Sequence, residues 1–304
     1  MTHTLRDVYQ NVTNKIIEAL ETGTPPWVHP WQSGAGDWCP ANLSSGRRYS
    51  GVNVLLLNMT AMQCGYSANR WLTYQQARSL GAQVRKGEQG TEVVFFKMHE
   101  FGAGATEPAA GKQDDRKVIP LIRSFTVFNA GQIDDLPAAL MPTPAPIHEW
   151  EACEAAEVIL ANSGADIRHG GTKAFYSPSE DRIQMPDRSA FASAAAYSRV
   201  ALHELTHWTG HASRCNRVLS SRVHIEAYAF EELVAEMGSA FLTDHCGLAG
   251  QLQHASYIES WLKALKNDKK LIFTAASQAQ KAADFLLPPV AEPIPQAAAV
   301  LATV

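Results

Sequence analysis

Two histidines and a glutamate at a fixed spacing are the residues of this sequence best suited to chemistry. His203, Glu204 and His207 follow the pattern H-E-x-x-H. On a helix, residues four apart lie on one face, so both imidazoles can bind one metal ion. Glu204 lies roughly 100° further round the same helix and can act on water at the metal without being a ligand. The pattern predicts a zinc site with His203 and His207 as ligands and Glu204 as the catalytic base.

The residues around this motif favour the helix that the chemistry requires. Segment 190–202 is rich in alanine and other good helix formers. Gly210 follows the motif closely and is a natural helix end. We therefore expect both histidines on one helix that ends near Gly210.

A third metal ligand has to come from outside the motif, because a catalytic zinc ion usually has three protein ligands and one open position. His211 lies one turn beyond His207, but Gly210 is expected to end the helix before it. The metzincin pattern requires its third histidine at position 213, which is Ser213 here. The metzincin pattern is therefore excluded, and His211 is disfavoured.

The apolar-periodic segment 225–246 predicts a second helix that carries the third ligand. Glu232 and Glu236 are four residues apart in it and share a helix face. One of them can bind the metal while the other accepts the free N–H of a ligating histidine. We predict Glu232 as the ligand, with Glu231 as the alternative, and Glu236 as the hydrogen-bonding partner of a histidine. This arrangement resembles that of the gluzincins.

The composition indicates a cytoplasmic protein with two domains. A chain of 304 residues, of which 46% are hydrophobic, can form two cores. No apolar run reaches the roughly 18 residues that a membrane span needs, and residues 1–7 lack the apolar stretch of a signal peptide. The 5 cysteines are odd in number and include no C-x-x-C pair, which favours reduced thiols over disulfides or a cysteine-bound metal.

Changes in composition divide the chain. Prolines between residues 135 and 149 predict a stiff linker. It separates an N-terminal domain, residues 1–134, from a C-terminal domain, residues 150–287. The Pro- and Ala-rich tail, residues 288–304, is expected to be disordered.

The two domains differ in charge and in their predicted elements. Residues 1–130 carry 13 Lys and Arg against 10 Asp and Glu, whereas residues 131–304 carry 13 against 20, so the basic part is the N-terminal one. The fold class is predicted as α+β, with the C-terminal domain mainly helical around a small sheet. Besides the two helices above, the predicted elements are helices 5–21 and 54–64, a hairpin of strands 92–98 and 117–128 with a long tip, and a hairpin of strands 174–177 and 182–185. The last hairpin would place an edge strand beside the metal-binding helix, where an extended peptide can add to the sheet.

Cations and aromatic residues of the N-terminal domain suit nucleic acid. Arg47, Arg48 and Tyr49 lie together in one glycine-containing loop, and Arg85 and Lys86 lie in another. Cations beside exposed loop backbone can bind phosphates, and nearby aromatic rings can stack on unpaired bases. Burial of these aromatic rings in the core is the alternative.

Both domains resemble those of one known family. The N-terminal segments 25–31, 48–53, 71–77 and 84–88 resemble the single-stranded-DNA-binding domain of ArdC-type antirestriction proteins, a domain shared with TraC-type plasmid primases. The C-terminal segments 203–207, 210–211, 231–236 and 261–265 resemble the zincin-like metallopeptidase domain of the same proteins. The resemblance implies a protein of a conjugative plasmid or mobile element that binds single-stranded DNA and protects incoming DNA from restriction. It adds Asn53 and Trp71 to the candidate DNA-binding residues.

Two functions remain open at this point. In the first, a DNA-bound metallopeptidase uses Zn²⁺, or another divalent metal, and a host restriction protein is the candidate peptidase target. In the second, the protein coats DNA and its metal site is structural or non-proteolytic. An intact H-E-x-x-H motif with a plausible third ligand favours a working site, but it does not distinguish the two.

Overall fold

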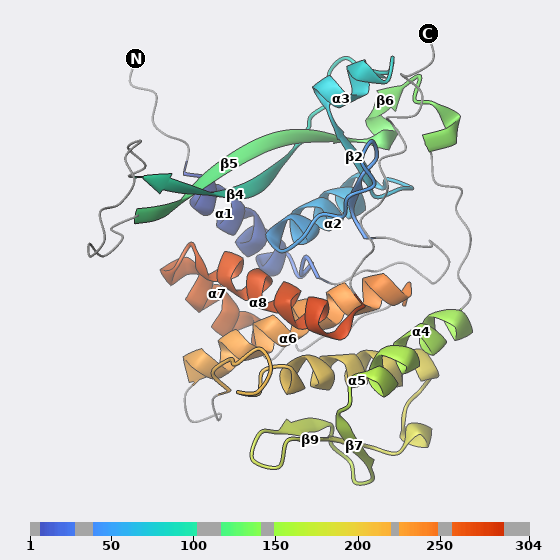
Figure 1. Ribbon diagram of the computed structural model, residues 1–304, viewed down its shortest axis with the longest axis vertical. Helices are drawn as coiled ribbons and strands as arrows, with labels where there is room; N and C mark the ends of the chain where they lie inside the picture. Colours follow the sequence, from blue (N-terminus) through green and yellow to red (C-terminus); the bar gives the residue numbers. More distant parts are fainter. Residues whose placement is uncertain are drawn as a thin grey trace, which may run out of the picture.

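The fold class is α+β, as predicted. The computed structural model describes residues 7–27, 39–101, 117–140, 149–219, 225–248 and 257–288. In Figure 1 the described elements form layers, with a long strand hairpin on one side, a stack of helices in the middle and a small sheet on the opposite side.

The N-terminal half is built around a four-stranded sheet in the order β1-β2-β5-β4. β1 is parallel to β2, and the β2–β5 and β4–β5 pairs are antiparallel. A short pair, β3 with β6, lies beyond it. The elements are α1 (Val8–Glu21), β1 (Ala41–Asn42), α2 (Val52–Cys64), β2 (Arg70–Thr73), α3 (Tyr74–Ser79), β3 (Gln83–Val84), β4 (Thr91–Phe101), β5 (Lys117–Asn129) and β6 (Ile133–Asp134).

The C-terminal half is mainly helical, with a three-stranded sheet in the order β7-β9-β8. β9 pairs in parallel with β7 and antiparallel with β8, so β8 is an edge strand. The elements are α4 (Glu149–Asn162), β7 (Asp166–His169), β8 (Phe175–Ser177), β9 (Arg182–Met185), α5 (Ala194–Trp208), α6 (Ile225–Cys246), α7 (Ile258–Asn267) and α8 (Leu271–Leu286).

Most predicted elements are confirmed. The second predicted helix, residues 225–246, is α6, and both predicted hairpins form as β4 with β5 and β8 with β9. β7 was not predicted. The hairpin tip at 102–116, the linker residues 141–148 and the tail residues 289–304 lie outside the described part of the chain.

One hydrophobic core runs through both halves. It includes Ile16 and Leu55 from the N-terminal half and Leu202, Leu233 and Ala279 from the C-terminal half, all of them almost fully buried. α1 packs against α7, and α2 packs against α8. The two predicted domains are therefore not joined by a linker alone.

Polar contacts also cross between the halves. The Thr13 hydroxyl donates to the Lys269 carbonyl at 2.7 Å. The buried Asn58 amide donates to the Asp244 carboxylate at 3.0 Å. Because buried polar groups are costly without partners, these bonds fix the register of one half on the other.

No helix in the described part of the chain has the length and apolar character needed to span a bilayer.

The helices α5 and α6 cross at very short range. A Cβ atom added at Gly238 of α6 would lie 2.5 Å from Cγ2 of Thr206 on α5. Thr206 is fully buried and its hydroxyl donates to the Leu202 carbonyl at 2.8 Å, so the side chain is held in place. Glycine at position 238 is thus what lets the two helices approach.

Replacement of Gly238 by alanine should destabilise the protein. Overpacking against Thr206 costs about 1–3 kcal/mol, against a gain of about 1 kcal/mol in helix propensity. Denaturant unfolding followed by circular dichroism measures the difference in free energy.

The matched background is Thr206→Ser, which keeps the hydroxyl and removes the colliding methyl group. In that background Gly238→Ala should be clearly less destabilising, because the contact with Cγ2 at 2.5 Å is gone and the closest remaining atom of residue 206 is its hydroxyl oxygen at 3.2 Å. An equal effect of Gly238→Ala in both backgrounds would show that the close crossing is not the cause.

Candidate metal centre

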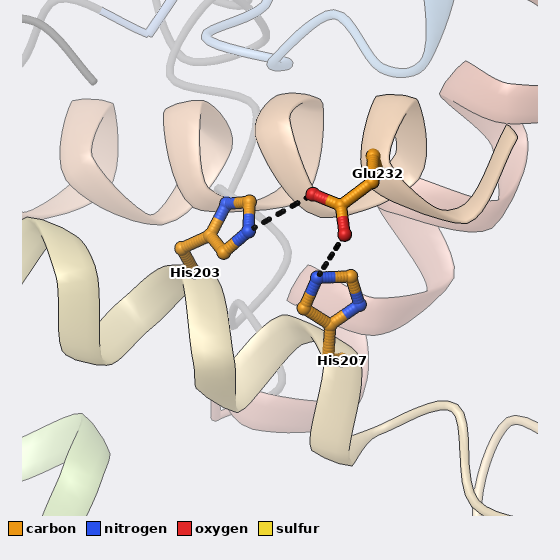
Figure 2. Close-up of side chains that lie close together, drawn as sticks. All are labelled: His203, His207 and Glu232. Atoms are coloured by element: carbon orange, nitrogen blue, oxygen red, sulfur yellow. Dashed lines mark ion pairs between the residues drawn. The ribbon is translucent and has the colours of Figure 1, made fainter. Parts of the chain in front are cut away.

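α5 and α6 bring His203, His207 and Glu232 together in the buried interior (Figure 2). His203 Nε2 lies 3.7 Å from Glu232 Oε2, and His207 Nε2 lies 3.8 Å from Glu232 Oε1. All three potential ligand atoms lie within 4.8 Å of one another. These distances are too long for hydrogen bonds.

The spacing and the donor types fit a divalent cation. Two ligand atoms that each lie about 2.0–2.1 Å from a tetrahedral ion are roughly 3.3 Å apart, so small side-chain shifts would bring this cluster around one ion. Two imidazoles and one carboxylate are a donor set of catalytic zinc sites. The three residues predicted as ligands are thus the ones that the fold brings together.

The surroundings of Glu232 keep its carboxyl group ionised. Burial by itself would raise its pKa, but the nearby imidazoles of His203 and His207 and a hydrogen bond from Tyr228 lower the pKa of Glu232 to about 2. A carboxylate rather than a carboxylic acid is the form that binds a metal ion. The residue is therefore ready to act as a ligand at any physiological pH.

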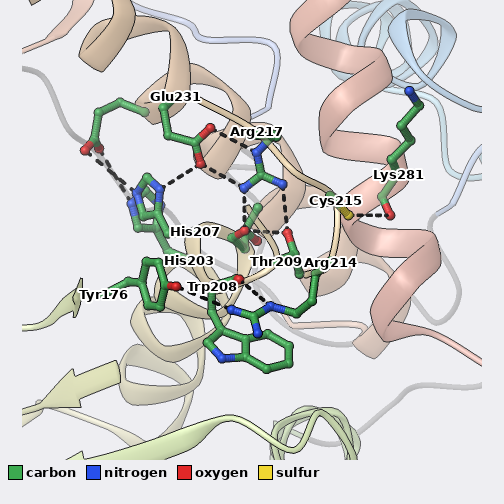
Figure 3. Close-up of polar contacts among 12 residues, drawn as sticks. Tyr176, His203, His207, Trp208, Thr209, Arg214, Cys215, Arg217, Glu231 and Lys281 are labelled. Atoms are coloured by element: carbon green, nitrogen blue, oxygen red, sulfur yellow. Dashed lines mark hydrogen bonds and ion pairs between the residues drawn. The ribbon is translucent and has the colours of Figure 1, made fainter. Parts of the chain in front are cut away.

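Glu231 orients His207 (Figure 3). Its Oε1 lies 3.1 Å from His207 Nδ1. Burial opposes charge on both groups, yet their contact with each other raises the pKa of His207 and, together with Arg217, lowers the pKa of Glu231. Because a carboxylate can only accept, Nδ1 of His207 must carry the proton, which leaves Nε2 free to bind a metal ion.

Arg217 holds Glu231 in place from the segment after α5. Its Nε donates to Glu231 Oε2 at 2.9 Å and its Nη2 donates to Oε1 at 2.8 Å. Further bonds to the Thr209 hydroxyl at 2.8 Å and to the Thr206 carbonyl at 2.7 Å anchor the guanidinium at the end of α5. This buried bidentate pair supports the histidine that in turn would support the metal.

Gly210 leaves the room that this arrangement needs. α5 ends at Trp208, so the helix stops where Gly210 predicted. A Cβ atom at Gly210 would lie 2.9 Å from the His207 carbonyl oxygen and 3.0 Å from Arg217 Nη2. The nearest atom is Leu219 Cδ2 at 2.7 Å, so a side chain at position 210 would displace Leu219 as well as the arginine.

Glu231, predicted as the alternative ligand, is the residue that orients His207, and the role of Glu236 beside a ligating histidine stays a prediction. Glu236 is buried on the same helix, but the hydrogen bond to the His207 ring comes from Glu231, the residue considered as the alternative ligand. Neither Arg217 nor Tyr228 was identified from the sequence. Arg217 acts through a contact between separate segments, which leaves no local pattern. Tyr228 lies four residues before Glu232 on α6, so the i, i+4 spacing was a signal that could have identified it.

Glu204, His211 and Tyr257 differ in their relation to this cluster. Glu204 is buried on α5, and its negative charge contributes to the raised pKa of His207. His211 bonds through its Nδ1 to the Ser213 hydroxyl at 2.8 Å instead of joining the cluster. The Tyr257 hydroxyl donates to that of Tyr228 at 3.3 Å, which links it to Glu232. His224 and His254, two further histidines of the C-terminal half, lie outside the described residues.

Arg214 ties the small sheet to the end of α5. Its guanidinium stacks on the Trp208 ring at 3.7 Å, and its Nε donates to the Trp208 carbonyl at 2.8 Å. The same group forms an ion pair with Asp181, in the turn between β8 and β9. The edge strand β8, which also contacts α5, is thereby held near the metal cluster.

The candidate DNA-binding residues fall into two surface groups and two buried positions. Arg47, Arg48 and Tyr49 line a cleft of about 920 Å³. Arg85 and Lys86 line a separate hollow of about 530 Å³, where Arg85 is ion-paired with Glu88 and Asp134. The loop with Arg47 and Arg48 and the loop with Arg85 and Lys86 therefore line two separate hollows of the surface.

Trp71 and Asn53 have roles inside the fold instead. Trp71 is fully buried, and its Nε1 donates to Asn69 Oδ1 at 2.6 Å. Asn53 is buried too, and its side-chain amide exchanges two bonds of 2.7 Å with the backbone of Val94, which joins α2 to β4. A ring with no exposed face cannot stack on a base, so we remove Trp71 from the candidate DNA surface. Asn53 lines the cleft of Arg47 and Arg48, but its amide is engaged by the backbone.

Metal affinity should separate the two adjacent glutamates. Glu232→Gln removes a ligand and should weaken binding sharply, whereas Glu231→Gln should weaken it by about 10–100-fold, as expected for a group that orients a ligand. Competition with a fluorescent chelator measures the affinity, and elemental analysis measures the metal content.

His203→Ala should abolish tight binding, and His211→Ala, a nearby histidine outside the cluster, should leave it intact. If Glu231→Gln proved more harmful than Glu232→Gln, the ligand would be Glu231 and the assignment of Glu232 would be wrong.

Two family models match the chain in order. The N-terminal domain of the anti-restriction factor ArdC matches residues 6–128. A zincin-like metallopeptidase matches residues 154–278, a range that contains the whole metal cluster.

Relatives of known sequence match nearly all of this chain. A DNA primase TraC of Escherichia coli is 44% identical over 301 residues, which are 94% of this chain and 28% of that protein. A second TraC primase of Escherichia coli is 43% identical, and 20% of its length is covered, so the chain spans less than a third of either primase. An uncharacterized protein of Sinorhizobium fredii, y4eC, is 41% identical, with 92% of this chain and 91% of that protein covered.

Two solved structures are similar to this chain over most of its length. The metal-free crystal structure of the antirestriction protein ArdC from plasmid R388 is 44% identical, has a TM-score of 0.76 and is covered over 96% of its chain, against 92% of this one. The Mn(II)-bound crystal structure of the same protein has a TM-score of 0.73 at 43% identity. The chain belongs to the ArdC family of antirestriction proteins, with an ArdC N-terminal domain followed by a zincin-like metallopeptidase domain.

Proposed function

We propose that this protein is an antirestriction protein that binds single-stranded DNA and carries a metal-dependent peptidase site, and that it protects incoming DNA from restriction in the cytoplasm. The buried cluster of His203, His207 and Glu232 is the single observation that carries the peptidase part. The family relationship and the exposed cations of the N-terminal half support the DNA-binding part.

The chain supplies the groups that peptide hydrolysis needs. A divalent cation held by the three ligands would acidify water and polarise a carbonyl group. Glu204, next to a ligand on α5, can take a proton from water and return it to the leaving amine. The Tyr257–Tyr228 pair borders the cluster and can donate a hydrogen bond to a developing oxyanion. The edge strand β8 can hold an extended peptide through main-chain hydrogen bonds.

Zinc is the metal we propose for this site. Two imidazole nitrogens and one carboxylate suit Zn²⁺, which takes nitrogen and oxygen ligands in tetrahedral sites. Another divalent metal is the alternative, since the related ArdC protein of plasmid R388 has been crystallised with Mn(II). A host restriction protein is the peptidase target that would link this chemistry to protection.

Removal of the catalytic base should separate proteolysis from DNA binding. Glu204→Gln should keep the metal, because Glu204 is not a ligand, and should keep DNA binding, because the cations lie elsewhere. Any peptidase activity should fall by roughly 100–10,000-fold, the range for a lost general base. Cleavage of a fluorogenic peptide library by the metal-loaded protein measures the loss.

Protection in cells then identifies the mechanism. Transfer of unmodified plasmid DNA into restricting and non-restricting hosts is compared for the wild type and Glu204→Gln, with His203→Ala as a metal-free control. Loss of protection with Glu204→Gln supports proteolysis of a restriction protein. Full protection with this variant would contradict it and leave coating of single-stranded DNA, which is no substrate for duplex-specific enzymes, as the function.

Single-stranded DNA should bind better than duplex, because stacking requires unpaired bases. Arg48→Gln and Lys86→Gln should each weaken binding by the full-length protein, and added salt should weaken it further. Fluorescence anisotropy with a labelled oligonucleotide measures both effects. Lys173→Gln, an exposed lysine beside the small sheet, is the matched control. If duplex and single-stranded DNA bound with equal affinity, the interaction would be charge attraction alone, without stacking on bases.

A further inference from the structure

The cleft of about 920 Å³ lies between the two halves of the molecule. Its walls come from α1, the loop before α2, β4 and α8. Figure 1 shows α8 of the C-terminal half running alongside the N-terminal elements. None of the three metal-ligand candidates lines this cleft. The C-terminal half therefore contributes a surface that is separate from the metal centre.

The cations of the cleft come equally from both halves. Arg47 and Arg48 lie in the loop before α2. Lys270 is the residue just before α8, and Lys281 lies within α8. All four are exposed. Asp284 is the one acidic residue among the residues described as lining the cleft, and the Gln280 amide donates to it at 2.8 Å. Four cations against one anion suit a polyanion, although the C-terminal half as a whole is acidic.

Exposed aromatic rings accompany these cations. Phe95 and Phe96 lie on the edge strand β4 with 46% and 49% of their surfaces exposed. Phe96 faces Tyr9 and Phe273, at ring distances of 6.3 Å and 6.1 Å. Large exposed rings beside cations are the combination by which proteins bind single-stranded nucleic acid, with bases on the rings and phosphates on the cations.

The walls of the cleft are fixed relative to each other. The Gly51 backbone N–H donates to Gln280 Oε1 of α8 at 3.0 Å. Arg48 Nη1 lies 3.2 Å from His245 Nδ1 in the last turn of α6. The loop that carries Arg47 and Arg48 is thus tied to two helices of the C-terminal half, so the four cations keep their spacing without a ligand.

We propose that this cleft binds single-stranded DNA, with Lys270 and Lys281 of the metallopeptidase half contacting phosphates together with Arg47 and Arg48, and with Phe96 as a stacking surface. This rests on the proposed function, in which the protein binds single-stranded DNA. It extends the DNA site beyond the ArdC N-terminal domain, because half of its cations come from α8 and the residue before it.

The test uses the full-length protein and a labelled oligothymidylate of 20 nucleotides. The double variant Lys270→Gln/Lys281→Gln should lose at least about tenfold in affinity at 0.1 M salt, and the salt dependence of log K should weaken by about 1.4, since each single-strand phosphate contact contributes about 0.7. Phe96→Leu should lower the affinity with an unchanged salt dependence, because stacking involves no ion release.

The control is Lys173→Gln/Lys263→Gln, which removes two exposed charges from the same half outside the cleft and should change affinity by less than about threefold. The thermal unfolding midpoints of the lysine variants should match that of the wild type, since the replaced lysines are exposed. The cleft assignment is overturned if the wild type binds and the Lys270/Lys281 variant binds equally well, or if the control loses as much affinity as that variant. Either result leaves standing the proposal that the N-terminal half binds single-stranded DNA. Absence of wild-type binding overturns the proposed function itself.

Discussion

The close crossing of α5 and α6 is the constraint on which the metal centre depends. His203 and His207 come from one helix and Glu232 from the other, so the ligand spacing is set by how near the two axes lie. Gly238 allows that approach. The same crossing brings Glu231 to the ring of His207, where Arg217 holds it. An ion at this site would then be held by groups that are already aligned, so little ordering would be needed on binding.

Burial of so many charged groups would be unfavourable if each stood alone. Glu231 and Arg217 satisfy each other in a bidentate pair beside His207, one of the candidate ligands. Such a buried pair adds little net stability compared with apolar side chains, but removal of one partner is costly. We interpret the Glu231–Arg217 pair as a means of fixing the tautomer and the ring position of His207.

The sequence allowed prediction of those features that depend on local patterns. The H-E-x-x-H motif, the long apolar period of α6 and the strand-forming residues of β4 and β5 all have local signals, and these elements were predicted. β7 was missed because it is short, mostly exposed, and formed through parallel pairing with β9. The division of roles between Glu231 and Glu236 depends on the rotation of α6 and on the approach of Arg217. Trp71 lies in a polar stretch, and only the packed sheet buries it.

Helix α8 contacts both the helix of the candidate metal centre and the proposed DNA cleft. One face of this helix is a stripe of buried alanines, among them Ala275, Ala279 and Ala283, and the helix packs along α6. Its other face carries Lys281 into the cleft between the halves. Small side chains let α8 approach α6 closely, so a DNA strand in the cleft would touch a helix that is packed directly on the helix bearing Glu232. Because the two halves share one core, a peptidase site would stay beside bound DNA and could act on proteins that reach that DNA.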